Sequence, residues 1–372
     1  KTNKTNVPDT TTTIPVGNGV LFFFRGTKNP GGNSSTSGTQ LIAPFNFPDD
    51  VTLTQVGTLN TGTVNVREWY ANAAQGNKFS FTAGWVGYGT SPLTGGYTFV
   101  GNPYASTINW EKYNRNGANS TIYGTVATTI WMFNPANKQF QAYTQKSSVT
   151  SVADTTTTIN SGTGSASNMI ASGQGFFVKA TATGQTLSFR EAAKTAAQPT
   201  AASLHNLMGK PKEFVSAPEP SLRLQLQKDS VNNDDILIRV NSQASGKFAN
   251  NEDAEDLGGS GALESLSAYS SDSVAVCIDK VPFPGKQQQV IPLNTDATGS
   301  GTYKLVSTEL NNLPAFYEVW LKDAFNNDSL KLAPNVSYQF TIDKSNPATF
   351  GNKRFTIIIR QNQHYVYKLL DF

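Results

Sequence analysis

The chain has 372 residues, of which 38% are apolar, 11% aromatic and only 15% charged. Its length allows two or three domains of about 150 residues, and its many aromatic and few charged side chains exclude intrinsic disorder over most of the chain. The net charge is only +3 and Lys and Arg do not cluster, so no nucleic-acid partner is expected, and no apolar run is long enough for a membrane span.

Residue types that carry hydrolytic or metal chemistry are scarce. Cys277 is the single cysteine and lies in the strand-like run Val274–Ile278, which favours a core position over a catalytic one. Only two histidines occur, and no Gly-x-Ser-x-Gly motif is present. Glycoside hydrolysis would need two facing carboxylates, and acids are sparse in the first 200 residues. We therefore expect no enzymatic activity and no bound cofactor.

Alternation of apolar and polar residues predicts β-strands along the chain, in order at 51–56, 63–66, 222–227 and 337–342. In Leu222–Gln227 the three leucines face one side, and Arg223 and Gln225 face the other. The continuous apolar run Phe355–Ile359 predicts a strand covered on both faces. Helical periodicity is nearly absent, and helical turns are expected only within 106–113 and 203–208, one each, and within 251–257, one or two. The pattern predicts an all-β protein with two or more β-sandwich-like domains in tandem.

The composition changes near residue 200. Of the 42 threonines, 35 lie in residues 1–200, whereas 35 of the 55 charged residues lie after them. An Ala- and Pro-rich stretch separates the two parts. We therefore predict a Thr/Gly-rich β domain over 1–195, a linker or crossover over 196–220, and a β-sandwich domain over 221–372. Because the chain begins at Lys1 with no signal-like segment, a processed product or a fragment is expected.

Two short glycine motifs, Gly17-Asn-Gly19 and Gly173-Gln-Gly175, are each followed by an apolar run. A phosphate-binding loop would need a third glycine and a following helix. Here strands follow, so the glycines are expected to supply positive φ in tight turns. The stretches around them are similar, which favours a shared turn-then-strand device over a strict tandem repeat.

Three acidic segments, 229–235, 252–256 and 323–328, have the oxygen-rich composition that calcium prefers. None has the spacing of a 12-residue calcium loop, the length that defines the EF-hand. Asn and Asp are also standard turn-forming residues, so turn chemistry is favoured and calcium stays the alternative.

Aromatic residues concentrate between positions 69 and 88. If exposed, Trp69, Tyr70, Trp85 and Tyr88 would stack on sugar rings and form a glycan-binding site. If buried together with Phe79 and Phe81, the same side chains would belong to a sandwich core. The core interpretation is favoured, and Gly84, Gly87 and Gly89 keep the exposed-loop alternative open.

Several stretches in a fixed order resemble the β-rich regions of surface proteins exported by the type IX secretion system of Bacteroidota. They are Ile14–Gly26, Gly57–Val64, Phe99–Ser106 with Ile108–Trp110, Trp131–Pro135, Gly173–Lys179, Leu187–Glu191, Asp253–Asp256, Leu313–Pro314, Val319–Asp323 and Arg354–Ile357. The resemblance implies export through that machinery to the extracellular face of the bacterial cell. It carries no catalytic residue.

The resemblance also implies O-glycosylation of Ser or Thr that follows Asp and precedes an apolar residue or Thr. The residues that fit this pattern are Thr10, Thr155, Ser230, Ser273 and Ser329.

Two functions follow as hypotheses. The first is a non-enzymatic structural segment of an exported cell-surface protein, such as an adhesin or an extracellular filament subunit, whose partners are copies of itself or other surface proteins. The alternative is a glycan-binding module of a secreted protein. In a filament, the polar segment Lys1–Pro8 would extend onto a neighbouring subunit as a donated strand, whereas the simpler expectation is a disordered tail.

Overall fold

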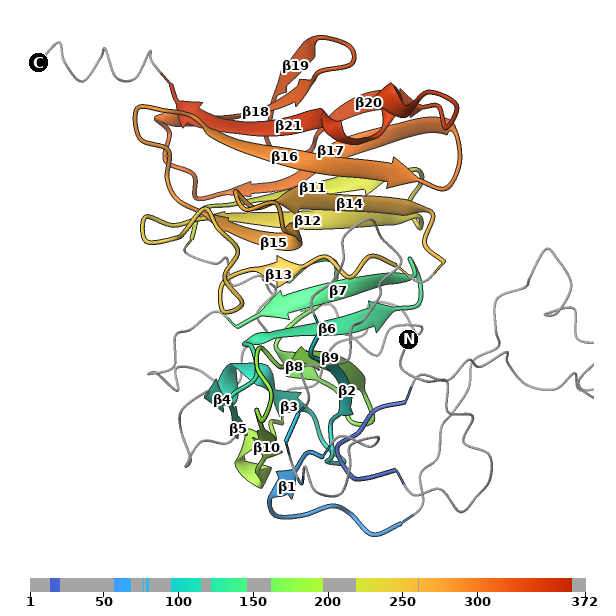
Figure 1. Ribbon diagram of the computed structural model, residues 1–372, viewed down its shortest axis with the longest axis vertical. Helices are drawn as coiled ribbons and strands as arrows, with labels where there is room; N and C mark the ends of the chain where they lie inside the picture. The colour runs from blue at the N-terminus through green and yellow to red at the C-terminus, as the bar shows by residue number, and fades with distance from the viewer. Residues whose placement is uncertain are drawn as a thin grey trace, which may run out of the picture.

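A computed structural model describes residues 14–20, 57–67, 76, 78–79, 95–114, 122–145, 162–196, 219–259 and 261–362. This part of the chain is built from β-strands and contains no α-helix, which confirms the all-β prediction (Figure 1). Its helical elements are three short 3-10 turns, η3(Trp110–Lys112), η4(Glu191–Ala193) and η5(Pro347–Thr349). Within these residues no helix has the length and apolar character needed to cross a membrane. The strand expected at 51–56 and the turn expected at 203–208 lie outside the described residues.

The first unit comprises the described residues up to 196 and contains three small sheets. One sheet has the order β2(Tyr97–Gly101), β9(Gly175–Lys179), β6(Thr129–Asn134), β7(Gln139–Thr144). A second has the order β1(Val64–Asn65), β10(Leu187–Phe189), β5(Ile122–Gly124), β4(Tyr113–Asn114), and β3(Ile108–Asn109) pairs with β8(Met169–Ile170). Buried aromatic rings fill the space between the sheets, with Trp110 stacked on Tyr113 and in edge contact with Phe176. The turn expected within 106–113 is η3.

The two glycine motifs meet at strand β2. Gly17 and Gly173 have φ of +88° and +73°, as expected for glycines in tight turns. Gly19 and Gly175 have a different role, because both lie against the ring of Phe99. A Cβ atom would come within 2.6 Å of this ring at Gly19 and within 2.5 Å at Gly175. The similar motifs thus flank one strand, with Asn18 bridged to Val100 and Gly175 paired with Gly101.

Replacing Gly175 by alanine is expected to destabilise the protein by about 1–3 kcal/mol, because the added methyl group overpacks the Phe99 ring. Denaturant unfolding of the purified chain measures this effect. Gly285→Ala is the matched control, since a Cβ atom there has no neighbour within 4 Å. Equal stability of the two variants would contradict the close contact of Gly175 with Phe99.

The second unit comprises the described residues from 219 and contains an 11-stranded sheet. Its strands are β11(Ser221–Gln227), β12(Asn233–Val240), β13(Ala254–Glu255), β14(Glu264–Tyr269), β15(Ala275–Val281), β16(Gln289–Ala297), β17(Gly301–Asn311), β18(Tyr317–Asp323), β19(Asp328–Lys331), β20(Val336–Ile342) and β21(Gly351–Gln361). Their order is β19-β18-β21-β16-β14-β15-β12-β11-β17-β20, and β13 also pairs with β15. The β12–β15 pair is parallel and the other strand pairs are antiparallel. One apolar core contains residues from both ends of this order, including Leu321 of β18 and Phe340 of β20.

The two ends of the sheet meet at a side-chain contact, which we call the seam. Arg354 of β21 is paired with Asp323 of β18 at 3.0 Å, and the two side chains are 1% and 0% exposed. The same guanidinium donates to the carbonyl oxygen of Thr341 in β20 at 2.7 Å. It also lies about equally far from the rings of Phe340 and Phe355, 4.8 Å from each centroid. The seam therefore links three strands through one fully buried cation.

Three details differ from the sequence expectation. In β11 the leucines are buried as expected, but Arg223 on the opposite face is buried as well, because the first unit covers that face. In β21, Thr356 and Ile358 are only half-buried, so the strand is not covered on both faces. The prediction of a helical turn within 251–257 was wrong for the second half of this segment, where Ala254 and Glu255 form β13 and pair with β15. Cys277 of β15 is buried, as predicted.

Candidate functional site: the junction between the two units

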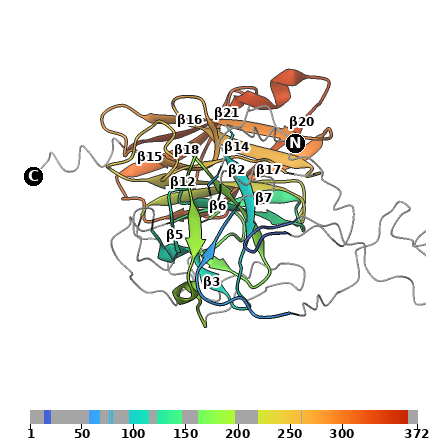
Figure 2. The ribbon, with the colours of Figure 1, turned by 60° about the horizontal axis from the view of Figure 1, so that its bottom comes forward.

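An apolar cluster joins the first unit to the second and forms the centre of what we call the junction. The first unit contributes Tyr97, Trp131, Phe140, Ala142 and Phe177, and the second contributes Leu237, Ala254, Leu257, Cys277 and Ile278. In Figure 1, β13 of the second unit lies beside β7 of the first, and Figure 2 also shows β6 and β7 below the strands of the second unit. Burial of each large side chain contributes about 1.5–3 kcal/mol, so this cluster holds the units together strongly.

The local sequence explains how one sheet serves two cores. Successive side chains of a strand point to opposite faces. In β6, Ile130 and Met132 belong to the core of the first unit, whereas Trp131 and Phe133 contact the junction cluster. The strand is therefore buried on both faces, although its sheet is antiparallel.

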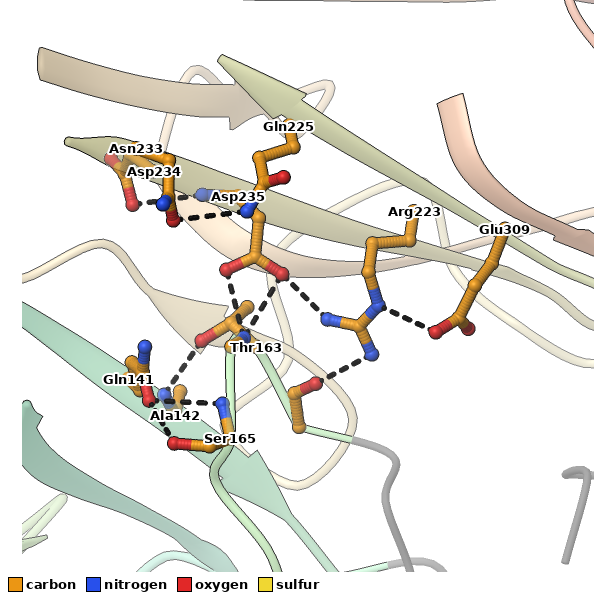
Figure 3. Close-up of polar contacts among 12 residues, drawn as sticks. Gln141, Ala142, Thr163, Ser165, Arg223, Gln225, Asn233, Asp234, Asp235 and Glu309 are labelled. Carbon is orange, nitrogen blue, oxygen red and sulfur yellow. Dashed lines mark hydrogen bonds and ion pairs between the residues drawn. The ribbon is translucent and has the colours of Figure 1, made fainter. Parts of the chain in front are cut away.

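A buried ion-pair network forms one side of the junction (Figure 3). The Arg223 guanidinium pairs with Asp235 at 2.6 Å and with Glu309 at 3.2 Å, and it donates to the carbonyl oxygen of Gly162 at 2.8 Å. Asp235 accepts the backbone N–H of Gly164 at 2.8 Å. Residues 162–165 of the first unit are thus held by charged side chains of β11 and β12.

The same loop is tied to the first unit by strand β7. Thr163 exchanges two hydrogen bonds with the backbone of Ala142, each 2.8 Å long. The Gln141 side chain accepts from both the backbone and the hydroxyl of Ser165 at 3.0 Å. Gly164 has φ of +54°, a conformation that favours glycine, and a Cβ atom there would lie 2.0 Å from the Gln141 side chain.

Further hydrogen bonds cross the junction from β6 and β7. The Trp131 indole N–H donates to the carbonyl oxygen of Glu255 at 2.9 Å, and the Gln139 amide donates to that of Glu264 at 2.7 Å. The backbone N–H of Phe140 donates to Gly258 at 3.1 Å. Since these polar groups are buried and satisfied, they fix the orientation of the units as well as their contact.

A second buried ion pair crosses the junction between strands β9 and β13. Lys179 of β9 and Glu255 of β13 are 2.5 Å apart, with side chains 4% and 3% exposed. The Tyr97 hydroxyl donates to the other carboxylate oxygen of Glu255. Burial lowers the pKa of Lys179, against the opposing charge of Glu255. Burial, together with that charge, raises the pKa of Tyr97 well above its ordinary value.

The acidic segments considered for calcium are occupied by protein partners. Asp229 accepts from the backbone of Val231 and Asn232, and Asp235 and Asp323 are paired with arginines. In the segment 252–256, Glu252 pairs with Lys280 at 3.5 Å and Glu255 with Lys179. Among the described residues, no three His, Cys, Asp or Glu side chains are grouped so that they could hold a metal ion.

Several of the buried carboxyl groups near the junction have raised pKa values. Burial raises the pKa of Asp253 and Asp279 to about 7 and that of Asp256 to about 6. Between the ordinary pKa of 3.8 and these values, the folded chain binds more protons than the unfolded chain. The stability that these three groups contribute is therefore fully present below about pH 4 and is lost as the pH rises to between 6 and 7.

We expect the free energy of unfolding to fall by at least about 3 kcal/mol between pH 5 and pH 8, since one pKa unit corresponds to about 1.4 kcal/mol. Denaturant titrations at the two pH values measure this difference. Asp279→Asn, which removes one titrating group and keeps its shape, is expected to reduce it. Stability that increases with pH over this range would contradict the prediction.

The structure describes only some of the sites predicted from the sequence. Trp69, Tyr70, Trp85 and Tyr88 lie outside the described residues, so the glycan site stays a prediction, which a glycan array with Trp69→Ala and Trp85→Ala tests. Phe79 of the same cluster is 1% exposed and belongs to the core of the first unit. Thr10 and Thr155 are also outside the described part. Ser230, Ser273 and Ser329 are all exposed.

Sequence reasoning did not find the junction. Arg223 stood on the polar side of an alternating strand, and Lys179 ended an apolar run, so both resembled solvent-facing residues. A charged residue inside an otherwise buried strand was the available signal. Its partners were not identifiable, because Lys179 and Glu255 are 76 residues apart in the chain.

Comparison with known proteins shows the family of this chain. A family model described as Domain of unknown function (DUF8693) matches residues 6–359, which covers both units and the segment between them. The chain belongs to this family. No curated protein and no solved structure matches it.

Proposed function

We propose that the chain is a non-enzymatic structural segment of an exported cell-surface protein, either an adhesin or an extracellular filament subunit. The junction is the observation that supports this proposal most directly. An apolar cluster and two buried ion-pair networks hold the units in one orientation. An apolar junction of this kind opposes relative motion of the two units, which suits a rigid segment of a stalk or filament.

Surface exposure is tested by placing an epitope tag between Asn326 and Asn327, in the exposed turn after β18. Intact cells of the source bacterium that express the tagged parent protein should bind the antibody, and loss of the type IX secretion machinery should remove the signal. A tag that is reached only after lysis would contradict the proposal.

The adhesin and filament forms of the proposal differ in assembly. If residues 1–13 are donated to a neighbouring subunit, the purified chain forms filaments visible by electron microscopy, and deletion of these residues abolishes them. If the chain stays monomeric at high concentration, self-assembly is excluded and partners among other surface proteins are favoured. Filaments that survive the deletion would rule out donation from this end.

O-glycosylation of exposed serines belongs to the same proposal. Ser230, Ser273 and Ser329 each follow an aspartate and lie in exposed turns or at the start of a strand, where a modifying enzyme can reach them. Peptide mass spectrometry of the protein from its native host should find hexose-containing adducts at one or two of these positions. Unmodified peptides at all three would contradict glycosylation of the described sites.

A further inference from the structure

In the ion pair between Lys179 and Glu255, the amine nitrogen lies close to the carboxyl carbon. The Lys179 Nζ atom lies 2.5 Å from the Glu255 Oε1 atom. Since a carboxyl C–O bond is about 1.2 Å long, Nζ is at most about 3.7 Å from the carboxyl carbon. This upper limit lies just above the roughly 3–3.5 Å of a near-attack arrangement, in which an amine and a carbonyl carbon are held ready to react.

The Lys179 amine is buried in a largely apolar environment. Both side chains are almost fully buried, and the Lys179 amine lies over the rings of Tyr97 and Phe248 at 5.5 and 5.2 Å from their centroids. Burial of this amine lowers its pKa, which favours the unprotonated form that acts as a nucleophile. In an environment of low polarity, transfer of one proton from the ammonium to the carboxylate removes two buried charges at once.

Tyr97 is placed to assist at the other oxygen. Its hydroxyl donates to Glu255 Oε2, on the side of the carboxyl group away from the amine. A donor at this position stabilises the negative charge that develops on the oxygen when an amine attacks the carbon. The pair therefore has a nucleophile, an electrophile and an oxyanion donor in contact.

We propose that Lys179 and Glu255 are joined by an intramolecular amide bond, an isopeptide cross-link that ties the first unit covalently to the second. The Lys179 ammonium first transfers a proton to Oε1, and the resulting amine attacks the carboxyl carbon. A second amine proton passes to Oε1, the C–Oε1 bond breaks, and Oε1 leaves as water. Oε2 remains as the amide oxygen and one hydrogen remains on nitrogen, so the reaction needs no oxidant, reductant or cofactor.

The cross-link would add a covalent bond between two units whose contact is otherwise noncovalent. Cys277 is the only cysteine, so the chain has no means to form a disulfide within itself. An amide between strands β9 and β13 would supply a covalent connection between the units that reducing agents do not break. This inference does not depend on where the protein is located or on what it binds.

Intact-mass spectrometry of the full purified chain under denaturing conditions tests the bond directly. The expected mass is lower than the sequence mass by one water molecule. For a second test, a protease recognition site is inserted between residues 197 and 218. Cleavage at this site leaves Lys179 on one fragment and Glu255 on the other. After cleavage, the cross-linked chain runs as one band on a denaturing, reducing gel, whereas an ordinary ion pair gives two.

Lys179→Arg is the matched control, since it keeps the positive charge but lacks the primary amine. It should show the full sequence mass and two bands after cleavage. Loss of water in this variant too would place the dehydration elsewhere and overturn the proposal. A wild-type chain with the full sequence mass would overturn it without any variant.

Discussion

Replacing Arg354 by methionine is expected to lower the free energy of unfolding by about 3–5 kcal/mol, which is a large part of the stability of a typical domain. The substitution leaves the Asp323 carboxylate buried without its cation, although this side chain is 0% exposed. It also removes the hydrogen bond to the Thr341 carbonyl oxygen, which links β21 to the edge strand β20. Denaturant unfolding followed by circular dichroism measures the loss.

Arg360→Met is the matched control for this prediction, because Arg360 lies in the same strand β21. Its ion pair with Glu318 has a similar length, 2.7 Å, but the arginine side chain is 48% exposed. An exposed pair contributes about 0–1 kcal/mol, so this variant should be nearly as stable as the wild type. Equal losses at the two positions would contradict the conclusion that burial of the seam causes the effect.

The double variant Arg354→Met with Asp323→Leu distinguishes two costs, the loss of the ion pair itself and the penalty of leaving one buried charge unpaired. Replacing both partners by apolar residues of similar size removes the buried charge altogether. This variant should therefore recover part of the stability that Arg354→Met loses. A double variant whose loss of stability relative to the wild type equals the sum of the losses of the two single variants would show that the two residues act independently.

Replacing Arg223 by methionine is expected to have a comparable effect, about 3–5 kcal/mol, at the junction. Asp235 would lose the cation 2.6 Å away, and the carbonyl oxygen of Gly162 would lose its donor. Because Asp235 also holds the Gly164 backbone N–H, the loop 162–165 should loosen. Hydrogen exchange should therefore rise at this loop more than in the core of either unit.

Gln225→Met is the matched control for Arg223→Met, because both residues lie in strand β11. Gln225 lies two residues along β11, is half-buried, and donates to Asn233 of its own unit at 2.9 Å. Its replacement should cost no more than about 1 kcal/mol and leave exchange in the loop 162–165 unchanged. Faster exchange at Gly164 in this variant would show that the loop responds to any change in β11, and would contradict a specific role of Arg223.

The local pattern of the sequence was sufficient to predict the all-β class and several strands. The alternation in Leu222–Gln227 and Ser337–Ile342 predicted β11 and β20, because a strand that faces a core on one side needs an apolar residue at every second position. The scarcity of helical periodicity agreed with a described part in which only three 3-10 turns are helical. The glycines of positive φ at positions 17 and 173 were also predictable, because turn conformation is a local property.

Tertiary structure alone decided which polar residues are buried and what they bind. Arg223, Lys179 and Glu255 look like surface residues in sequence, yet all three are buried where the units meet. The outer face of β21 shows the opposite case, because Ile358 is only half-buried and none of the described residues covers it fully. Burial of a strand's second face depends on packing between segments far apart in the chain. The alternation within one strand reports only that its two faces differ, and carries no information about which distant segment covers either of them.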